Sequence, residues 1–235
     1  DLYHEKKLPQ LLRELCKLDF HWIRLHYLYP DTITDELIDT IAAEPKICKY
    51  IDMPIQHCND TILKAMRRRE THAGLLALMD KLRSRIPGVV LRTSLITGLP
   101  YEDEAAFDEL CEFLRRTHIE RAGVFPYSPE EGTPAAEMPN RVDTAEAGRR
   151  AELVVDVQSR IMDDFNESRM GDLVEVLCEG FDPQSMQYMG RSYAESPDID
   201  GHIYFNSEAD VDPGDFVMVR VTGAMDGELV GEREE

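Results

Sequence analysis

The chain has 235 residues, with 26 Lys and Arg against 46 Asp and Glu, a formal net charge of −20. This length is typical of one large domain, or of a medium-sized domain plus a small one, and it needs no metal or disulfide to build a core. No apolar run reaches the ~18 residues that a membrane span requires, and no basic segment followed by an apolar one resembles a secretory signal. The acidic balance argues against a duplex or a tRNA as the main partner, because phosphate binding needs clustered Lys and Arg.

Five cysteines are irregularly spaced, and no two of them have the C-x-x-C spacing of a zinc site or an iron–sulfur site. An odd number of irregularly spaced cysteines favours reduced, mostly buried thiols in a cytoplasmic protein. The chain begins with Asp1 rather than Met, which indicates a piece of a longer protein.

Residues 1–168 alternate strand and helix signals. Strands are expected at residues 22–29, 50–55, 89–97 and 122–125. Helices are expected between them, where apolar residues recur at helical spacing, with Thr34, Asn59 and Thr71 as N-terminal caps. A long amphipathic helix is expected to follow a proline-rich loop and to stop at Gly171. Alternating strands and helices predict a parallel sheet, and four such units make only part of an eight-fold barrel, which takes about 250 residues.

Residues 169–235 show a different pattern. Short strands are expected at residues 172–178, 187–193, 202–205, 215–222 and 228–230, with turn signals between them. Five short strands in such a segment predict a small closed antiparallel β-barrel. The segment carries four Arg, no Lys and sixteen Asp and Glu, a net charge of −12. Barrels of this kind often bind single-stranded nucleic acid, but here the basic residues are missing, so we expect most of the aromatic residues to be core.

Four stretches go beyond generic patterning: residues 22–30 (WIRLHYLYP), 50–58 (YIDMPIQHC), 91–100 (LRTSLITGLP) and 124–135 (VFPYSPEEGTPA). In this order, ahead of a small acidic barrel, they resemble the radical-SAM methylthiotransferases, and most closely the RimO type, which modifies a ribosomal protein. The resemblance covers essentially the whole chain.

The resemblance implies an α/β fold. Residues 1–168 would be the C-terminal part of a partial parallel (β/α) barrel of the radical-SAM type, and residues 169–235 a five-stranded TRAM β-barrel. The parent enzyme would use S-adenosylmethionine and two [4Fe–4S] clusters. The C-x-x-x-C-x-x-C motif of the family is absent from this sequence. The chain would therefore contain no cluster ligands and be inactive alone.

The implied chemistry is reductive cleavage of S-adenosylmethionine to a 5′-deoxyadenosyl radical, which takes a hydrogen atom from an unactivated carbon that then receives a methylthio group. In the RimO type this carbon is the β-carbon of an aspartate in the twelfth small-subunit ribosomal protein. That basic protein suits an acidic barrel. Two alternatives stay open: the same chemistry on tRNA, and a non-catalytic interaction module. The absence of any Lys after Lys81 disfavours the tRNA alternative.

In parallel barrels the functional groups lie at the carboxyl ends of the strands. Six residues at or near these ends are the candidates for contact with S-adenosylmethionine: Gln56, His57, Arg92, Gly98, Val124 and Phe125. The Gln56 amide would bond the ribose or the methionine part of the cofactor. Arg92 would pair with the methionine carboxylate, or else form a structural salt bridge.

The other four candidates also have two interpretations each. His57 would contact cofactor or substrate, or be a satisfied structural histidine. Gly98 would let the backbone approach the adenine, or simply make a turn. Val124 and Phe125 would supply an edge strand and an apolar wall for the adenine, or pack in the core.

Two features depart from the family pattern. Tyr101 stands where the family usually has glycine, and it would be strained if the turn requires a positive φ. Residues 67–69 are three consecutive arginines, the densest basic cluster in the chain. They would form either a solvated helix end or a contact with nucleic acid or an acidic surface.

Overall fold

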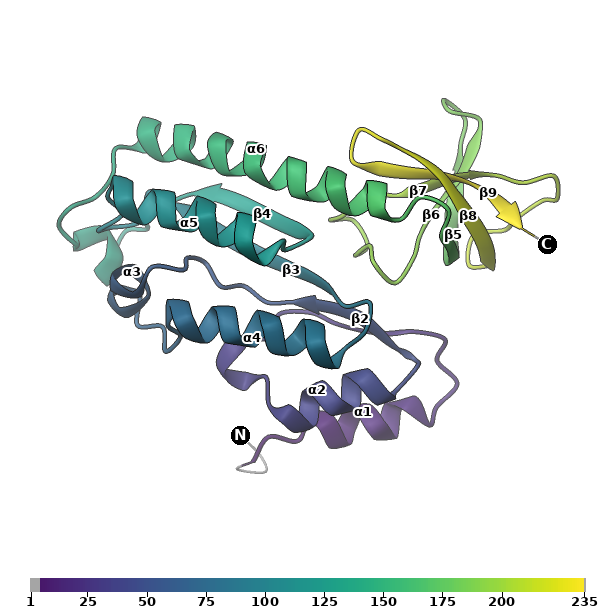
Figure 1. Cartoon of the computed structure of the whole chain (residues 1–235), viewed down its shortest axis with the longest axis horizontal. Coiled ribbons are helices and arrows are strands. Elements are labelled where there is room, and N and C mark those ends of the chain that lie inside the picture. Colours follow the sequence, from purple (N-terminus) through teal and green to yellow (C-terminus); the bar gives the residue numbers. More distant parts are fainter. Residues whose placement is uncertain (1–4, 235) are drawn as a thin grey trace. The chain divides into compact units, whose positions relative to one another are not determined.

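The computed structural model describes residues 5–234 and divides into two compact units, one ending at Gln158 and one beginning at Ser159 (Figure 1). Helix α6 (Thr144–Ser168) begins in the first unit and ends in the second without a break. The domain boundary expected between residues 168 and 169 falls at the end of this helix and stays a prediction. No helix in the described part of the chain is both long and apolar enough to span a membrane.

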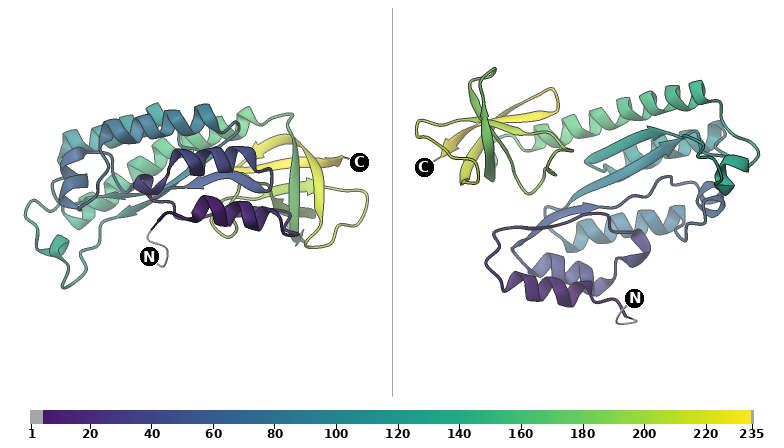
Figure 2. Two further views of the ribbon diagram at one scale, coloured as in Figure 1. Left: turned by 90° about the horizontal axis from the view of Figure 1, so that it is seen from below. Right: turned by 180° about the vertical axis from the view of Figure 1, so that it is seen from behind.

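The first unit is built on a four-stranded sheet in which all neighbouring strands are parallel, in the order β1-β2-β3-β4. The strands are β1 (Ile23–Leu25), β2 (Ile47–Asp52), β3 (Val90–Thr97) and β4 (Arg121–Pro126). The helices between them are α1 (Leu8–Cys16), α2 (Asp35–Ala43), α3 (Asp60–Ala65), α4 (His72–Arg85) and α5 (Glu104–Thr117), with short 3₁₀ turns at Pro30–Thr32 and Pro134–Glu137. Helices α4 and α5 lie over one face of the sheet, and the view from behind shows the strands in front of them (Figures 1 and 2). The predicted parallel sheet with helical crossovers is confirmed.

The three predicted helix caps are confirmed. The Thr34 hydroxyl accepts a hydrogen bond from the Leu37 amide, and Asn59 accepts two from the first turn of α3. Thr71 accepts from the Gly74 amide at the start of α4. Each cap satisfies backbone donors that the helix itself leaves open, which contributes about 1 kcal/mol.

The first two strands differ from their predicted ranges. β1 stops at Leu25 instead of residue 29, because Tyr27 adopts a left-handed conformation with φ 58° that interrupts the extended chain. The Leu28 amide still donates to the carbonyl oxygen of Asp52 at 2.8 Å, so the segment continues beside β2. The prediction of a strand at 50–55 was wrong at both ends, since β2 runs from Ile47 to Asp52. Pro54, which has no N–H, lies just beyond it.

The core of the first unit consists of aliphatic side chains between the sheet and its helices. Seven of them are at most 1% exposed: Ile38, Ile41, Ile51, Leu91, Leu95, Leu110 and Leu114. Burial of each such side chain contributes about 1.5–3 kcal/mol. All five cysteines are reduced, and every one except Cys16 is buried, as the sequence predicts.

The second unit contains a closed five-stranded barrel in the order β5-β6-β7-β9-β8. Its strands are β5 (Leu173–Asp182), β6 (Gln187–Arg191), β7 (Ile203–Asn206), β8 (Phe216–Met225) and β9 (Glu228–Glu234). The expectation of a fully antiparallel barrel was wrong for one pair, because β7 and β9 are parallel. A ring with an odd number of strands cannot alternate direction at every step, so closure forces one parallel pair.

The barrel interior is apolar, as expected. Its fully buried side chains include Val176, Ile203, Phe205, Val219 and Val221. The ring of Tyr188 stacks on that of Phe205, with centroids 5.6 Å apart. The expectation that most aromatic residues of this segment are core was wrong, because only Phe205 is buried, Tyr193, Tyr204 and Phe216 are partly buried, and Phe181 at the end of β5 is exposed.

The turn after β3 uses two left-handed residues. Gly98 has φ 78°, and a Cβ added to it would lie 2.2 Å from the Cβ of Ala147 in α6, so both conformation and packing require glycine. Tyr101 has φ 72°, and its amide donates to the carbonyl oxygen of Asn140 at 3.0 Å. The turn therefore does require a positive φ at the position where the family usually has glycine, as anticipated.

We expect the strain at Tyr101 to be measurable by comparing Tyr101→Gly with Tyr101→Ala. Both variants lose the ring, which packs beside Ile62, Leu99 and Ala106. They differ only in the Cβ that disfavours the left-handed conformation, so the glycine variant should be more stable by about 1–2 kcal/mol in urea unfolding. Equal stability of the two variants would contradict the strained turn.

Candidate functional site

The four strands of the first unit all point the same way, so their carboxyl ends meet at one edge of the sheet. In parallel α/β proteins this edge carries the functional groups. Here it is formed by the segments that follow β1, β2, β3 and β4. Three of these segments contain a non-glycine residue at positive φ, namely Tyr27, Gln56 and Tyr101. Backbone conformations of this kind are uncommon and concentrate at functional sites.

Gln56 is held through its main chain. Its amide donates to the carbonyl oxygen of Ser94 at 2.9 Å, and its own carbonyl oxygen accepts from the Ile96 amide at 2.8 Å. These bonds form an isolated parallel bridge to Leu95 that extends the β2–β3 pairing beyond Pro54. The backbone needs φ 69° at Gln56 to make both bonds. The side chain is half-buried, and within residues 5–234 its amide group makes no hydrogen bond.

His57, the next residue, is buried, and one of its two ring nitrogens makes a hydrogen bond. Its Nδ1 accepts a hydrogen bond from the Asn59 amide at 3.0 Å. The proton of the neutral ring must therefore be on Nε2, which lies 3.4 Å from Oε2 of Glu102. The contact with Glu102 is an ion-pair distance without hydrogen-bond geometry, so His57 is only partly satisfied, and both interpretations of this residue stay predictions.

Glu102 connects the segment after β3 to two other parts of the fold. Its Oε1 accepts from the Gly98 amide at 2.9 Å and from Nη1 of Arg150 in α6 at 3.0 Å. Burial opposes ionisation of this carboxyl, but the bonds from His57, Gly98 and Arg150 outweigh it, so the pKa of Glu102 lies below its ordinary value. The group is therefore a buried carboxylate at neutral pH. Sequence reasoning missed Arg150, which is 48 residues away from Glu102 and carries no local signal.

Arg92 is part of an ion pair inside the sheet. Its Nη1 lies 3.0 Å from Oδ1 of Asp52, and both side chains are buried. On the other carboxylate oxygen of Asp52, Nδ1 of the partly exposed His26 lies 3.7 Å away. Of the two roles considered for Arg92, the structure shows the salt bridge. A contact with a methionine carboxylate stays a prediction.

Val124 and Phe125 lie on β4, which is an edge strand of the sheet. Successive side chains of a strand point to opposite faces, and Phe125, opposite Ile96, shares the face of Arg92. A Cβ at Gly123 would lie 3.2 Å from Cε2 of Phe125 and 3.8 Å from Nη2 of Arg92, so the ring and the guanidinium flank the same glycine. The Phe125 ring is 55% exposed. It is thus an apolar surface at the predicted edge, whereas Val124 faces the other way.

The arginine cluster at residues 67–69 has a role that the sequence did not suggest. Arg68 donates from Nη2 to the carbonyl oxygen of Pro54, and its guanidinium lies 5.6 Å from the centroid of the Tyr29 ring. It therefore connects the segments after β1 and β2. Arg69 is exposed and lies 3.4 Å from the Asp31 carboxylate. Arg68 is therefore structural, whereas Arg67 and Arg69 are exposed, as a solvated helix end requires; a contact of the cluster with nucleic acid or an acidic surface stays a prediction.

Among residues 5–234, no three His, Cys, Asp or Glu side chains gather into a group that could hold a metal ion. The edge instead combines a half-buried amide (Gln56), an exposed ring (Phe125) and two buried ion-pair networks. Such a set suits an organic ligand with polar and aromatic parts.

The Arg92–Asp52 pair yields a stability prediction. Asp52→Ala leaves a buried guanidinium without its carboxylate, so we expect a loss of about 3–5 kcal/mol in urea unfolding. Replacing both residues, with Asp52→Leu and Arg92→Met, should cost less than the single change because no charge stays buried. Glu14→Ala, which removes an exposed pair with Lys17, is the control and should change the unfolding midpoint little. A small change in unfolding free energy for Asp52→Ala would show that the Arg92–Asp52 pair does not stabilise the fold.

Comparison with known proteins agrees with this geometry. Residues 3–114 match the Radical SAM superfamily, and residues 170–233 match the TRAM domain. Among solved structures, the chain is similar to coproporphyrinogen III oxidase (HemN) from Escherichia coli, which is described as a radical SAM enzyme. The TM-score is 0.52 and the sequence identity is 18%. The alignment covers 66% of this chain and 36% of the oxidase chain. This last likeness shows the fold alone.

Curated relatives cover the chain from end to end. Proteins named "Ribosomal protein uS12 methylthiotransferase RimO" are 45% identical over 99% of this chain in Acetivibrio thermocellus, 44% over 100% in Lachnoclostridium phytofermentans and 46% over 99% in Caldanaerobacter subterraneus. The aligned region is 51–53% of those three proteins, so the chain spans about half their length. Over its whole length the chain is therefore similar to radical SAM methylthiotransferases of the RimO type.

Proposed function

We propose that the protein of which this chain forms part transfers a methylthio group to ribosomal protein uS12, at the β-carbon of an aspartate. The observation that carries the proposal is the similarity of 39–46% to proteins named uS12 methylthiotransferases over at least 98% of this chain. The similarity runs through the parallel sheet, the edge with Gln56 and Phe125, and the acidic barrel. A ribosomal substrate would place the activity in the cytoplasm.

Radical SAM membership supports S-adenosylmethionine and an iron–sulfur cluster as cofactors. Bound together and reduced, they supply the radical that removes a hydrogen atom from the substrate carbon. The described residues do not fit a cluster, since no metal-binding group forms among them, so we place the ligands of both proposed [4Fe–4S] clusters outside this chain. The edge residues do fit the organic cofactor. The Gln56 amide would bond its polar part, and the Phe125 ring would cover its adenine and exclude water.

The proposal is tested on the full-length protein, with iron, sulfide and reductant supplied. With S-adenosylmethionine and purified uS12, the mass of uS12 should rise by one methylthio group in place of one hydrogen, and fragmentation should place the change on an aspartate. Modification of tRNA instead of uS12 would favour the alternative substrate. A full-length protein that binds no iron would overturn the enzymatic function altogether.

The barrel supports a basic protein as the partner. Three of the four arginines in residues 169–235 already form ion pairs with glutamates: Arg169 with Glu195, Arg191 with Glu179, and Arg220 with Glu234. The fourth, Arg233, donates to the Ser207 hydroxyl at 3.3 Å. The cations of the barrel are therefore engaged within it, and most of the sixteen acidic residues are left uncompensated. Such a surface attracts a basic polypeptide and repels nucleic acid.

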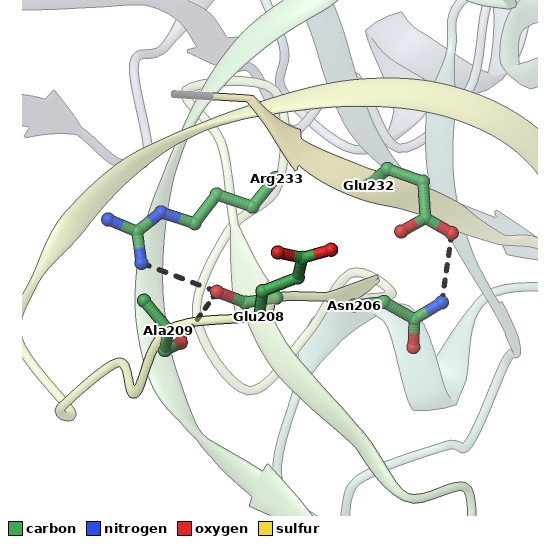
Figure 3. A pocket seen from close by; sticks show the side chains of 6 residues that line it. Asn206, Glu208, Ala209, Glu232 and Arg233 are labelled. Atoms are coloured by element: carbon green, nitrogen blue, oxygen red, sulfur yellow. Dashed lines mark hydrogen bonds between the residues drawn. The ribbon is translucent and has the colours of Figure 1, made fainter.

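One hollow on the barrel has suitable chemistry for a lysine or arginine side chain. It measures about 510 Å³ and is lined by Asn206, Ser207, Glu208, Ala209, Glu232 and Arg233. Figure 3 shows that the Glu208 carboxylate lies between Arg233 and Glu232. The amide of Asn206 donates to Glu232 at 2.9 Å and fixes that carboxylate.

We expect Glu208→Lys to weaken binding of this chain to purified uS12 about fivefold at low salt, because rim charges steer association. The difference should shrink as salt is raised, since the screening length falls from about 10 Å at 0.1 M to about 3 Å at 1 M. Asp80→Lys makes the same charge change on an exposed position of α4 and serves as the matched control. Equal losses for both variants, or affinity that does not depend on salt, would contradict a specific acidic contact.

A further inference from the structure

A buried chain of three ionisable side chains joins three separate parts of the first unit. His57 follows β2, Glu102 follows β3, and Arg150 lies on α6. The side chains of His57 and Glu102 are at most 1% exposed, and that of Arg150 is 7% exposed. All three side chains are buried, so we expect them to act on the sheet edge through their neighbours.

The hydrogen bonds set the direction of the chain. The Asn59 amide donates to Nδ1 of His57, so the proton of the neutral ring is on Nε2, which lies at ion-pair distance, 3.4 Å, from Oε2 of Glu102. Glu102 uses its other oxygen for the Gly98 amide and for Arg150. Arg150 also donates to the main-chain carbonyl oxygen of Glu102 at 2.9 Å, so it bonds both the side chain and the main chain of this residue.

The two anchored segments are those that carry the proposed cofactor contacts. Gln56 directly precedes His57, and its left-handed main chain is bonded on the other side to Ser94 and Ile96. Gly98 is bonded directly by Glu102. Buried ion pairs seldom add net stability compared with apolar side chains of the same size. Their better attested use is to select one arrangement among several.

We propose that His57 and Glu102 are positioning residues, which hold Gln56 and the Gly98 turn at a fixed separation at the carboxyl edge of the sheet. The separation is set without either residue touching the ligand. That the ligand is S-adenosylmethionine rests on the proposed function; the clamp itself, meaning His57, Glu102 and Arg150, is a property of this chain.

Two substitutions at His57 distinguish the loss of the His57–Glu102 contact from the loss of packing around the ring. In His57→Gln the side-chain amide stands in for Nε2 and keeps a donor toward Glu102. In His57→Asn the amide oxygen stands in for Nδ1 and keeps the bond from Asn59, but the link to Glu102 is lost. Both variants replace the ring with an amide, so they differ chiefly in that link.

The first measurement is amide hydrogen exchange on this chain alone. In His57→Asn, exchange should accelerate about tenfold or more at the amides of Gln56 and Ile96, whose bonds close the bridge. The amide of Leu91, which is bonded to Glu120 at 2.8 Å in the middle of the sheet, is the internal reference and should not change. His57→Gln should stay close to wild type. Equal acceleration at all three amides would indicate general destabilisation and overturn the clamp.

The second measurement uses the full-length enzyme. His57→Asn should raise the KM for S-adenosylmethionine about tenfold and leave kcat within about twofold, with His57→Gln restoring the wild-type KM. Unchanged exchange in His57→Asn disproves the clamp, whatever the ligand. Altered exchange with an unchanged KM shows instead that the clamp exists but does not serve the cofactor, and the proposed role of this edge then fails. If His57→Asn does not fold, Glu102→Gln takes its place, because it keeps an acceptor for Gly98 and removes the charge that Arg150 and His57 face.

Discussion

The parallel direction of four strands is the constraint on which the first unit depends. It brings four segments that are distant in sequence to one edge of the sheet. The main-chain groups of these segments lie beyond the strand ends and need hydrogen-bond partners there. The fold meets this demand partly with main-chain bonds beyond the strand ends, such as those of Gln56 to Ser94 and Ile96, and partly with side chains. Arg68 bonds the carbonyl of Pro54, Glu102 bonds the amide of Gly98, and His57 accepts from the amide of Asn59. The polar groups of the edge are therefore structural first, and the few that are left over, above all the Gln56 amide, are the ones free to serve a ligand.

Sequence reasoning reached the elements whose signals are local. Thr34, Asn59 and Thr71 were identified as caps because a cap depends on three or four consecutive residues. The strain at Tyr101 was anticipated only as a condition, because the family that the sequence resembles usually has glycine at this position. By contrast, the first strand was predicted too long, because the aromatic and β-branched composition of residues 22–29 hides the left-handed Tyr27.

The partners of the candidate site residues were beyond that reasoning. Arg92 was assigned either to a ligand or to a salt bridge, and only the register of β2 against β3 places Asp52 beside it. Arg150 gave no signal, since one arginine on a charged helix resembles any other. The parallel pair of β7 and β9 was not predicted, although five strands in a closed ring already require one parallel pair.

A closed barrel also limits how a partner can be recognised. Every strand of the described barrel has a neighbouring strand on both sides, so the barrel presents no complete edge strand for an incoming peptide to extend. A polypeptide that docks there would be recognised mainly through side chains, and the charged side chains of residues 169–235 are mostly carboxylates. Such recognition tolerates many backbone shapes but demands a particular spacing of positive charge, so a lysine- or arginine-rich loop can be accepted without first becoming a strand.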